Sequence, residues 1–154
     1  MSQCFSENLL AGKVAFVAGG TRGINLGIAK AFACAGARVA VIGRDAERAA
    51  AAQADIEQAS GESALGMSCD VRDYAAVETA IKTTAEAFGK IDILVSGAAG
   101  NFFSPIGGLS ANAFKTVVDI DLIGTFNVFR ASFDYLTKPG ASLIAITAGQ
   151  AEHA

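Results

Sequence analysis

The sequence has little that could support a histidine-based or metal-based site. It contains one histidine, His153, and three cysteines, Cys4, Cys34 and Cys69, which are widely spaced and form no Cys-x-x-Cys pattern. A single histidine excludes both a histidine-based catalytic triad and a multi-histidine metal site, so we predict no bound metal. An odd number of dispersed cysteines is typical of buried, reduced thiols in a cytoplasmic protein.

Charged residues are also scarce, at 18% of the chain, and the formal net charge is -3. Because there is no basic cluster either, we expect no nucleic-acid partner. No apolar run approaches the roughly 20 residues that a membrane-spanning helix requires, so we predict no membrane segment. Residues 1–10 are polar and do not resemble a secretory signal peptide. Hydrophobic residues, by contrast, reach 52%, which is typical of a sheet buried on both faces and favours an oligomer interface as well.

Strand-like and helix-like segments alternate along the chain. The expected strands are 13–18, 38–42, 64–69, 91–95 and 141–147, and the expected helices are 24–35, 46–59, 73–88 and 111–136. Asp73 and Ser110 are placed to cap the last two helices. This order predicts right-handed βαβ crossovers and a Rossmann-like, doubly wound parallel α/β sheet with strand order 3-2-1-4-5. We treat residues 1–154 as one such dinucleotide-binding domain.

The expected helix 111–136 is apolar on more than one face. Its large hydrophobic side chains cannot all lie on the single stripe that covers a sheet. The other faces need a partner, either a second subunit or further parts of the same domain. We expect a homo-oligomer formed through this helix, with Phe129 on the shared face.

The segment Val14–Gly27 is the strongest indication of a ligand. An apolar, β-branched run leads into a glycine turn and then directly into a helix. Glycines allow a sharp reversal that brings backbone amides close to a pyrophosphate, and the helix N-terminus adds the positive end of its dipole. We predict that the pyrophosphate is held by Gly19, Thr21, Arg22, Gly23, Ile24 and Asn25. Tight turns of this kind also occur without ligands.

Asn25 stands where the dinucleotide fingerprint has its third glycine. Two interpretations are open. Its side-chain amide either joins the pyrophosphate site or holds the first helix further from the sheet.

The corner after the second strand favours NADP(H) over NAD(H). No acidic residue directly follows Ile42, where NAD-binding proteins hold the ribose hydroxyls; Gly43 and Arg44 stand there instead. Arg44, with Arg22 from the glycine turn, could place two guanidinium groups near a 2′-phosphate. Asp45 argues mildly for NAD(H), and either arginine could simply be solvated.

Two later segments complete the predicted site. Asp70 and Val71 end the third strand, where an adenine would lie, although Asp70 could also cap the following turn. Ala98, Ala99 and Gly100 follow the fourth strand, and their small size would let a ribose and a nicotinamide approach the backbone. Asn101 then offers a donor and acceptors at the rim, or it is an ordinary turn residue.

Taken together, these residues resemble the short-chain dehydrogenase/reductase family over essentially the whole chain. Ala98–Phe102, Leu109–Val117, Asp119–Asp121 and Gly124–Val128 are more specific and resemble the 2,4-dienoyl-CoA reductase branch, above all its peroxisomal type. The resemblance implies NADPH-dependent reduction of a conjugated enoyl or dienoyl acyl-CoA thioester. It also implies that Asn101 hydrogen-bonds the thioester carbonyl, where it would stabilise an enolate oxygen.

The chain departs from the family pattern at several positions. Ser96-Gly97 replaces the usual Asn-Asn, and Asp121 replaces an asparagine, as it does in the peroxisomal reductases. The family's catalytic serine falls on Ala148, which leaves the neighbouring Thr147 as a candidate catalytic hydroxyl, and a tyrosine of the mitochondrial branch falls on Gln150. The family's last strands and its lysine-containing segment would lie beyond residue 154, so we expect the 154-residue chain to be catalytically weak by itself.

Two further functions are compatible with the same residues. One is a nicotinamide-binding sensor or scaffold without catalysis, which Ala148 favours. The other is a reductase of simple ketones or 3-oxoacyl thioesters, for which a Ser–Tyr–Lys arrangement is usual and against which Ala148 counts.

Overall fold

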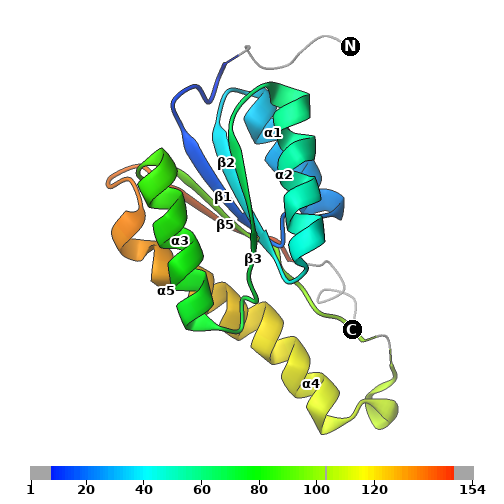
Figure 1. The fold of residues 1–154 in the computed structure, drawn as a ribbon. Coiled ribbons are helices and arrows are strands. Elements are labelled where there is room, and N and C mark those ends of the chain that lie inside the picture. Colours follow the sequence, from blue (N-terminus) through cyan, green and yellow to red (C-terminus); the bar gives the residue numbers. More distant parts are fainter. Residues whose placement is uncertain (1–7, 103, 148–154) are drawn as a thin grey trace.

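The computed structural model of the chain describes residues 8–102 and 104–147. Five parallel strands form one sheet in the order β3-β2-β1-β4-β5 (Figure 1), which confirms the predicted order. The strands are β1 (Val14–Ala18), β2 (Arg38–Gly43), β3 (Ala64–Ser68), β4 (Ile93–Ser96) and β5 (Ser142–Ala145).

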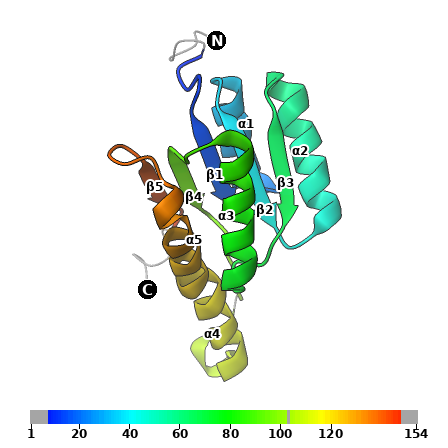
Figure 2. The same ribbon diagram turned by 60° about the vertical axis from the view of Figure 1, so that its left-hand side comes forward.

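Helices cover both faces of the sheet. Helices α1 (Gly23–Cys34) and α2 (Ala46–Ser60) pack on one face, and α3 (Tyr74–Phe88) and α5 (Gly124–Ser132) pack on the other (Figure 2). Helix α4 (Ala111–Val118) extends beyond the carboxyl ends of the strands (Figure 1). The fold is therefore the three-layer α/β arrangement that the alternating pattern predicts.

Strand β1 is buried on both faces because its side chains alternate between the two helical layers. Phe16 packs in the core cluster on the α3 side, whereas Ala15 and Val17 pack in the cluster on the α1 side. All five residues of β1 are at most 2% exposed. Burial of this kind contributes about 1.5–3 kcal/mol for each large apolar side chain.

The strand register places three connections at one edge of the sheet. Ala18 is paired with Ile42 of β2 and with Ser96 of β4. The segments that follow β1, β2 and β4 therefore leave the sheet side by side, at the edge where open α/β sheets bind their ligands.

The expected helix 111–136 is not one regular α-helix. Between α4 and α5 lies a π-helical segment, η2 (Asp119–Ile123), and a 3-10 helix, η3 (Phe133–Tyr135), follows α5. A π-turn takes one residue more than an α-turn, so it shifts the helical register of the side chains on either side of it. The connection between β4 and α4 contains a short 3-10 helix, η1 (Ile106–Gly108).

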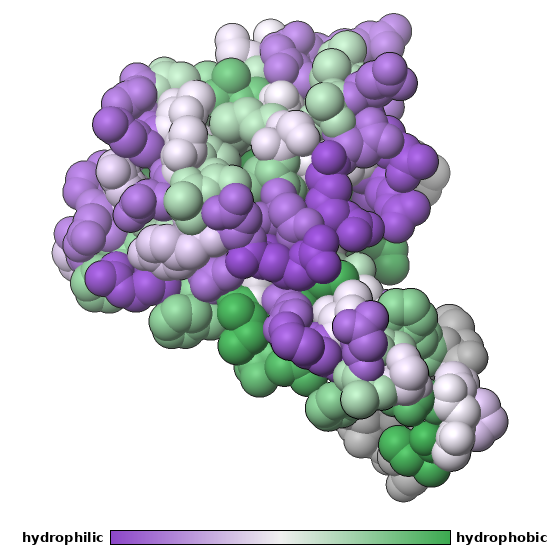
Figure 3. All heavy atoms as spheres, turned by 60° about the horizontal axis from the view of Figure 1, so that its bottom comes forward, coloured by the Kyte–Doolittle hydropathy of each residue, from purple (hydrophilic) through white to green (hydrophobic). Residues whose placement is uncertain are grey.

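Phe129 does not lie on a free face, which corrects the sequence-based expectation. Its ring is partly buried and packs against the core cluster on the α3 side. Other large apolar side chains of this region are 44–65% exposed: Phe114, Leu122, Ile123, Phe126 and Phe133. In Figure 3 the part of the molecule that projects at the lower right, which includes α4, carries hydrophobic residues at its surface.

The cysteines differ from one another in burial. Cys69 is buried, as expected, but Cys34 is exposed on α1, where its Sγ lies 3.5 Å from the Ala59 carbonyl oxygen. Neither forms a disulfide, and Cys4 lies outside the described residues. Within the described part of the chain, no helix is both long and apolar enough to cross a membrane.

Candidate functional site

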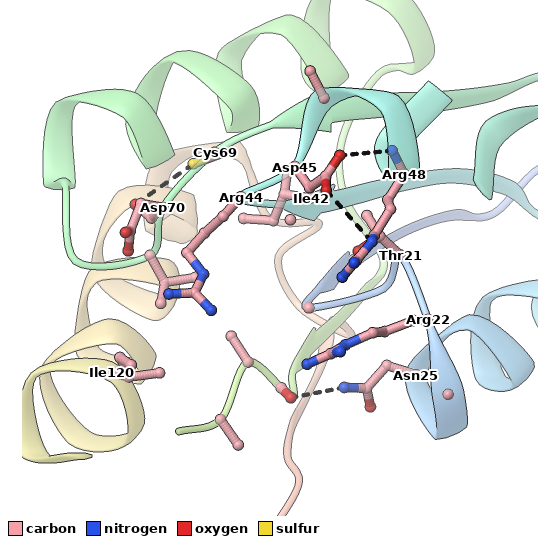
Figure 4. Close-up of a pocket in the computed structure, with 18 of the residues that line it drawn as sticks. Thr21, Arg22, Asn25, Ile42, Arg44, Asp45, Arg48, Cys69, Asp70 and Ile120 are labelled. Atoms are coloured by element: carbon pink, nitrogen blue, oxygen red, sulfur yellow. Dashed lines mark hydrogen bonds and ion pairs between the residues drawn. The ribbon is translucent and has the colours of Figure 1, made fainter. Parts of the chain in front are cut away.

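A pocket of about 820 Å³ opens at the carboxyl edge of the sheet (Figure 4). Its walls come from the segments after β1, β2, β3 and β4, with Ile120 of η2 opposite the turns. Most of the predicted cofactor residues line it: Gly19, Thr21, Arg22, Gly23, Asn25, Arg44, Asp70, Val71, Ala98 and Ala99. The structure therefore brings together residues that are up to about half the chain apart.

Four predicted site residues do not line this pocket. Ile24 is 78% exposed on α1, and Gly100 and Asn101 lie further along the loop after β4. Thr147 is exposed just after β5, while Ala148 and Gln150 lie outside the described residues. Among the described residues, no three His, Cys, Asp or Glu side chains are grouped so that they could hold a metal ion.

Gly19 shapes the turn after β1. Its φ is 75°, in the left-handed region that favours glycine, and its amide donates to the Ile42 carbonyl at 2.9 Å. A Cβ at this position would lie 2.7 Å from the Ala98 amide nitrogen. The turn thus rests directly on the backbone of the loop after β4 and forms a cradle that a side chain would fill.

Helix α1 begins without a side-chain cap. Asp45, Asp73 and Ser110 each accept a hydrogen bond from a backbone amide in the first turn of α2, α3 or α4, at 3.0–3.1 Å. The residue in the equivalent position of α1 is Arg22, which makes no such bond, and the first turn of α1 has no acidic residue. These amides and the positive end of the helix dipole are suited to an anion. With the cradle at Gly19, they fit the pyrophosphate of a nicotinamide dinucleotide.

Two arginines point into the pocket from neighbouring turns. Figure 4 shows Arg22 and Arg44 directed toward the same space between the turns and η2. Neither takes part in an ion pair within the described residues. The Asp45 carboxylate, which argued mildly for NAD(H), accepts from the Arg48 amide at 3.0 Å and lies 3.4 Å from its Nε. Asp45 is therefore engaged at the start of α2, and its charge is balanced by Arg48.

Asn25 reaches across to the loop after β4. Its Nδ2 donates to the Gly97 carbonyl oxygen at 2.7 Å (Figure 4). This contact is a third arrangement, beyond the two that the sequence left open, because the side chain connects two separate walls of the pocket.

The segment after β3, where the sequence predicts an adenine, forms another wall of the pocket. Asp70 Oδ1 accepts from the Arg72 amide at 3.0 Å, and its Oδ2 lies 2.5 Å from Arg72 Nη2. The hydrogen bonds from Arg72 hold the pKa of Asp70 below its usual range. Asp70 thus closes the turn while it lines the pocket. The Val71 carbonyl accepts from Asn127 Nδ2 at 2.9 Å, which ties this segment to α5.

Cys69 lines the same wall of the pocket, and its thiol is uncharged. Burial, together with the nearby charges of Asp70 and Asp73, raises the pKa of its thiol to about 11. The thiol therefore stays protonated near neutral pH, where only the thiolate is nucleophilic.

Two residues of η2 received no site assignment from the sequence. Asp121 Oδ1 accepts from the Gly100 amide at 2.7 Å, which fixes the backbone just before Asn101. Ile120 lines the pocket, and its Cδ1 would lie 2.7 Å from a Cβ at Gly100. One sequence feature did point to Asp121: it belongs to the stretch Asp119–Asp121, which resembles the 2,4-dienoyl-CoA reductase branch.

The sequence matches a known family and several of its members. The model of the family described as short chain dehydrogenase matches residues 13–154. A peroxisomal 2,4-dienoyl-CoA reductase of Rattus norvegicus is 43% identical over 145 residues, which are 94% of this chain and 50% of the relative. The corresponding protein of Saccharomyces cerevisiae is 42% identical over 144 residues, 92% of this chain and 49% of the relative. The chain spans about half the length of these relatives.

Solved structures have the same fold. A dehydrogenase/reductase of Sinorhizobium meliloti has a TM-score of 0.87 at 39% identity, covering 95% of this chain and 57% of that one. A short chain dehydrogenase of Burkholderia cenocepacia, in complex with NADP, has a TM-score of 0.85 at 33% identity, covering 93% and 58%.

The Asp70–Arg72 pair makes stability depend on pH. Because the folded-state pKa of Asp70 is lowered, the pair stabilises the fold above the unfolded-state pKa, and this stabilisation is lost as the pH falls through the folded-state pKa. We expect Asp70→Asn to lower the urea midpoint at about pH 7, with the gap to the wild type closing below about pH 4. A gap that stays constant down to about pH 3 would contradict this assignment.

Proposed function

The chain belongs to the short-chain dehydrogenase family, and from this premise we propose that it forms the cofactor-binding part of an NADP(H)-dependent reductase of conjugated enoyl or dienoyl thioesters. The observation that carries the proposal is the uncapped start of α1, which faces a pocket with two arginines that form no ion pair within the described residues. The names of the two dienoyl-CoA reductase relatives support the substrate class.

The pocket residues divide between the parts of the cofactor. The Gly19 cradle and the first amides of α1 would hold the pyrophosphate, and Arg44 would pair with the 2′-phosphate. Val71 would lie against the adenine, while Ala98 and Ala99 would lie against the inner ribose and nicotinamide. Bound NADPH supplies the hydride for the reduction.

Asn101 is the proposed substrate-polarising group. The Gly100–Asp121 hydrogen bond positions the backbone that precedes it. From there its side-chain amide would donate to the thioester oxygen as negative charge develops on it, which is the usual means of stabilising an enolate. Thr147, whose side chain is exposed after β5, is proposed as a second donor.

We propose the cytoplasm as the compartment. Cys34 and Cys69 form no disulfide, which is typical of a reducing environment. The names of the two relatives place those proteins in the peroxisome.

The Arg44→Ala substitution tests the cofactor preference. A charge-assisted bond to a phosphate contributes about 1.5–3 kcal/mol, so the Kd for NADPH should rise about tenfold to a hundredfold. The Kd for NADH, which lacks the 2′-phosphate, should change by less than about threefold. Arg130→Ala is the control because Arg130 is exposed on α5, away from the pocket. Equal losses for both cofactors would contradict the role of Arg44.

The reaction itself is tested with the full-length gene product and its Asn101→Ala variant. We expect the wild type to oxidise NADPH in the presence of a 2,4-dienoyl-CoA. Loss of one oxyanion donor should lower kcat by about a hundredfold to a thousandfold and leave the Kd for NADPH unchanged. Cofactor binding without turnover of any enone, ketone or thioester would identify a sensor instead. Turnover of 3-oxoacyl thioesters alone would identify the other class of reductase.

We also propose that the protein self-associates through α4 and α5, which expose the rings of Phe114 and Phe126. Phe126 is 60% exposed there, so Phe126→Asp should shift the full-length protein to a larger elution volume in gel filtration. Leu9→Asp is the matched control, since Leu9 is 55% exposed near the other end of β1. An unchanged elution volume for Phe126→Asp would contradict the proposed interface.

A further inference from the structure

The turn after β1 and the loop after β4 are joined by one side chain. We propose that Asn25 is a positioning residue: it holds the loop that receives the nicotinamide half of the cofactor in register with the turn that receives the pyrophosphate. This inference rests on the proposed cofactor and adds a role that the dinucleotide fingerprint does not contain, because that fingerprint has glycine at this position.

Both backbone polar groups of Gly97 are bound by the first βα unit. The Gly97 amide donates to the Ala18 carbonyl at 3.1 Å, and the Gly97 carbonyl accepts from Asn25 Nδ2 at 2.7 Å. The next residue, Ala98, is the one on which the Gly19 turn rests. The start of the loop is therefore located by β1 and α1 rather than by its own residues.

Gly97 leaves room for the Asn25 side chain. A Cβ at position 97 would lie 2.4–2.6 Å from the Nδ2, Oδ1 and Cγ atoms of Asn25. The asparagine thus fills the space that a side chain at position 97 would take. Asn25 and the Ser96-Gly97 pair were separate departures from the family pattern in the sequence, and the structure shows that they form one contact.

The hydrogen bond of Asn25 connects two walls of the pocket through a side chain. Its Nδ2 donates to the Gly97 carbonyl at 2.7 Å, and its Oδ1 atom is buried without a hydrogen-bond partner among the described residues. The bond therefore fixes where the loop after β4 begins relative to α1.

The position matters because the loop is fixed at two points. Asn25 holds Gly97, and Asp121 holds the Gly100 amide at 2.7 Å. Ala98 and Ala99, which line the pocket, lie between these points. Removing Asn25 would remove one of the two hydrogen bonds that hold Gly97 while leaving the Gly19 cradle and Arg44 in place.

The Asn25→Gly variant of the full-length protein tests this separation with two ligands. NADPH contacts the whole site, whereas 2′-phospho-ADP-ribose lacks the nicotinamide. We expect the Kd for NADPH to rise about fivefold to tenfold and the Kd for 2′-phospho-ADP-ribose to change by less than about twofold. Asn112→Gly, the same change in the first turn of α4 at an exposed position, should alter neither.

Equal weakening of both ligands, or no weakening of NADPH, would overturn the inference while leaving the proposed cofactor intact. A wild-type protein that binds neither ligand would overturn the proposed function, and the inference with it.

The fit between Asn25 and Gly97 is tested by Gly97→Ala alone and with Asn25→Gly. The single change should weaken NADPH binding or lower the melting temperature, because the new methyl group meets the Asn25 amide. In the double variant that amide is gone, so binding and melting temperature should return to the values of Asn25→Gly. If Gly97→Ala alone does not fold, recovery of folding in the double variant gives the same support. Additive losses would overturn the pairing.

Discussion

Strand β1 lies between β2 and β4, and its five side chains are almost completely removed from solvent by helices on both faces. A strand held in this way cannot shift along its neighbours without exposing apolar side chains or breaking the ladder. The pairing of Ala18 with Ile42 and Ser96 therefore fixes where the three connections leave the sheet. This packing locates the three pocket walls that follow β1, β2 and β4.

Two of the acidic side chains that line the pocket already form ion pairs with neighbouring arginines. Asp45 is balanced by Arg48 and Asp70 by Arg72. The positive groups of the pocket are Arg22, Arg44 and the uncapped start of α1, and Glu47 also lines it without an ion pair among the described residues. A chain with a net charge of -3 thus brings two arginines and a helix N-terminus to the same end of its sheet. These groups suit a ligand with several phosphate charges.

The strands, their order and the helix caps Asp73 and Ser110 could be predicted because they depend on local periodicity and on residues next to each element. The π-segment could not, since one extra residue in a helical turn leaves the apolar composition unchanged while it rotates Ile120 toward the pocket. Ten of the twelve predicted cofactor residues line the pocket. The two exceptions are Gly100 and Ile24, and Ile24 is exposed on the outer side of α1. The Asn25–Gly97 contact spans 72 positions, and nothing in either segment alone indicates the other.

The fit between Asn25 and Gly97 also couples two positions that lie far apart in the sequence. A side chain at position 97 would meet the end of the Asn25 side chain, which would then have to turn away and give up its bond to the Gly97 carbonyl. An exchange at either position therefore changes what the other can do, and the two positions are expected to vary together among related sequences.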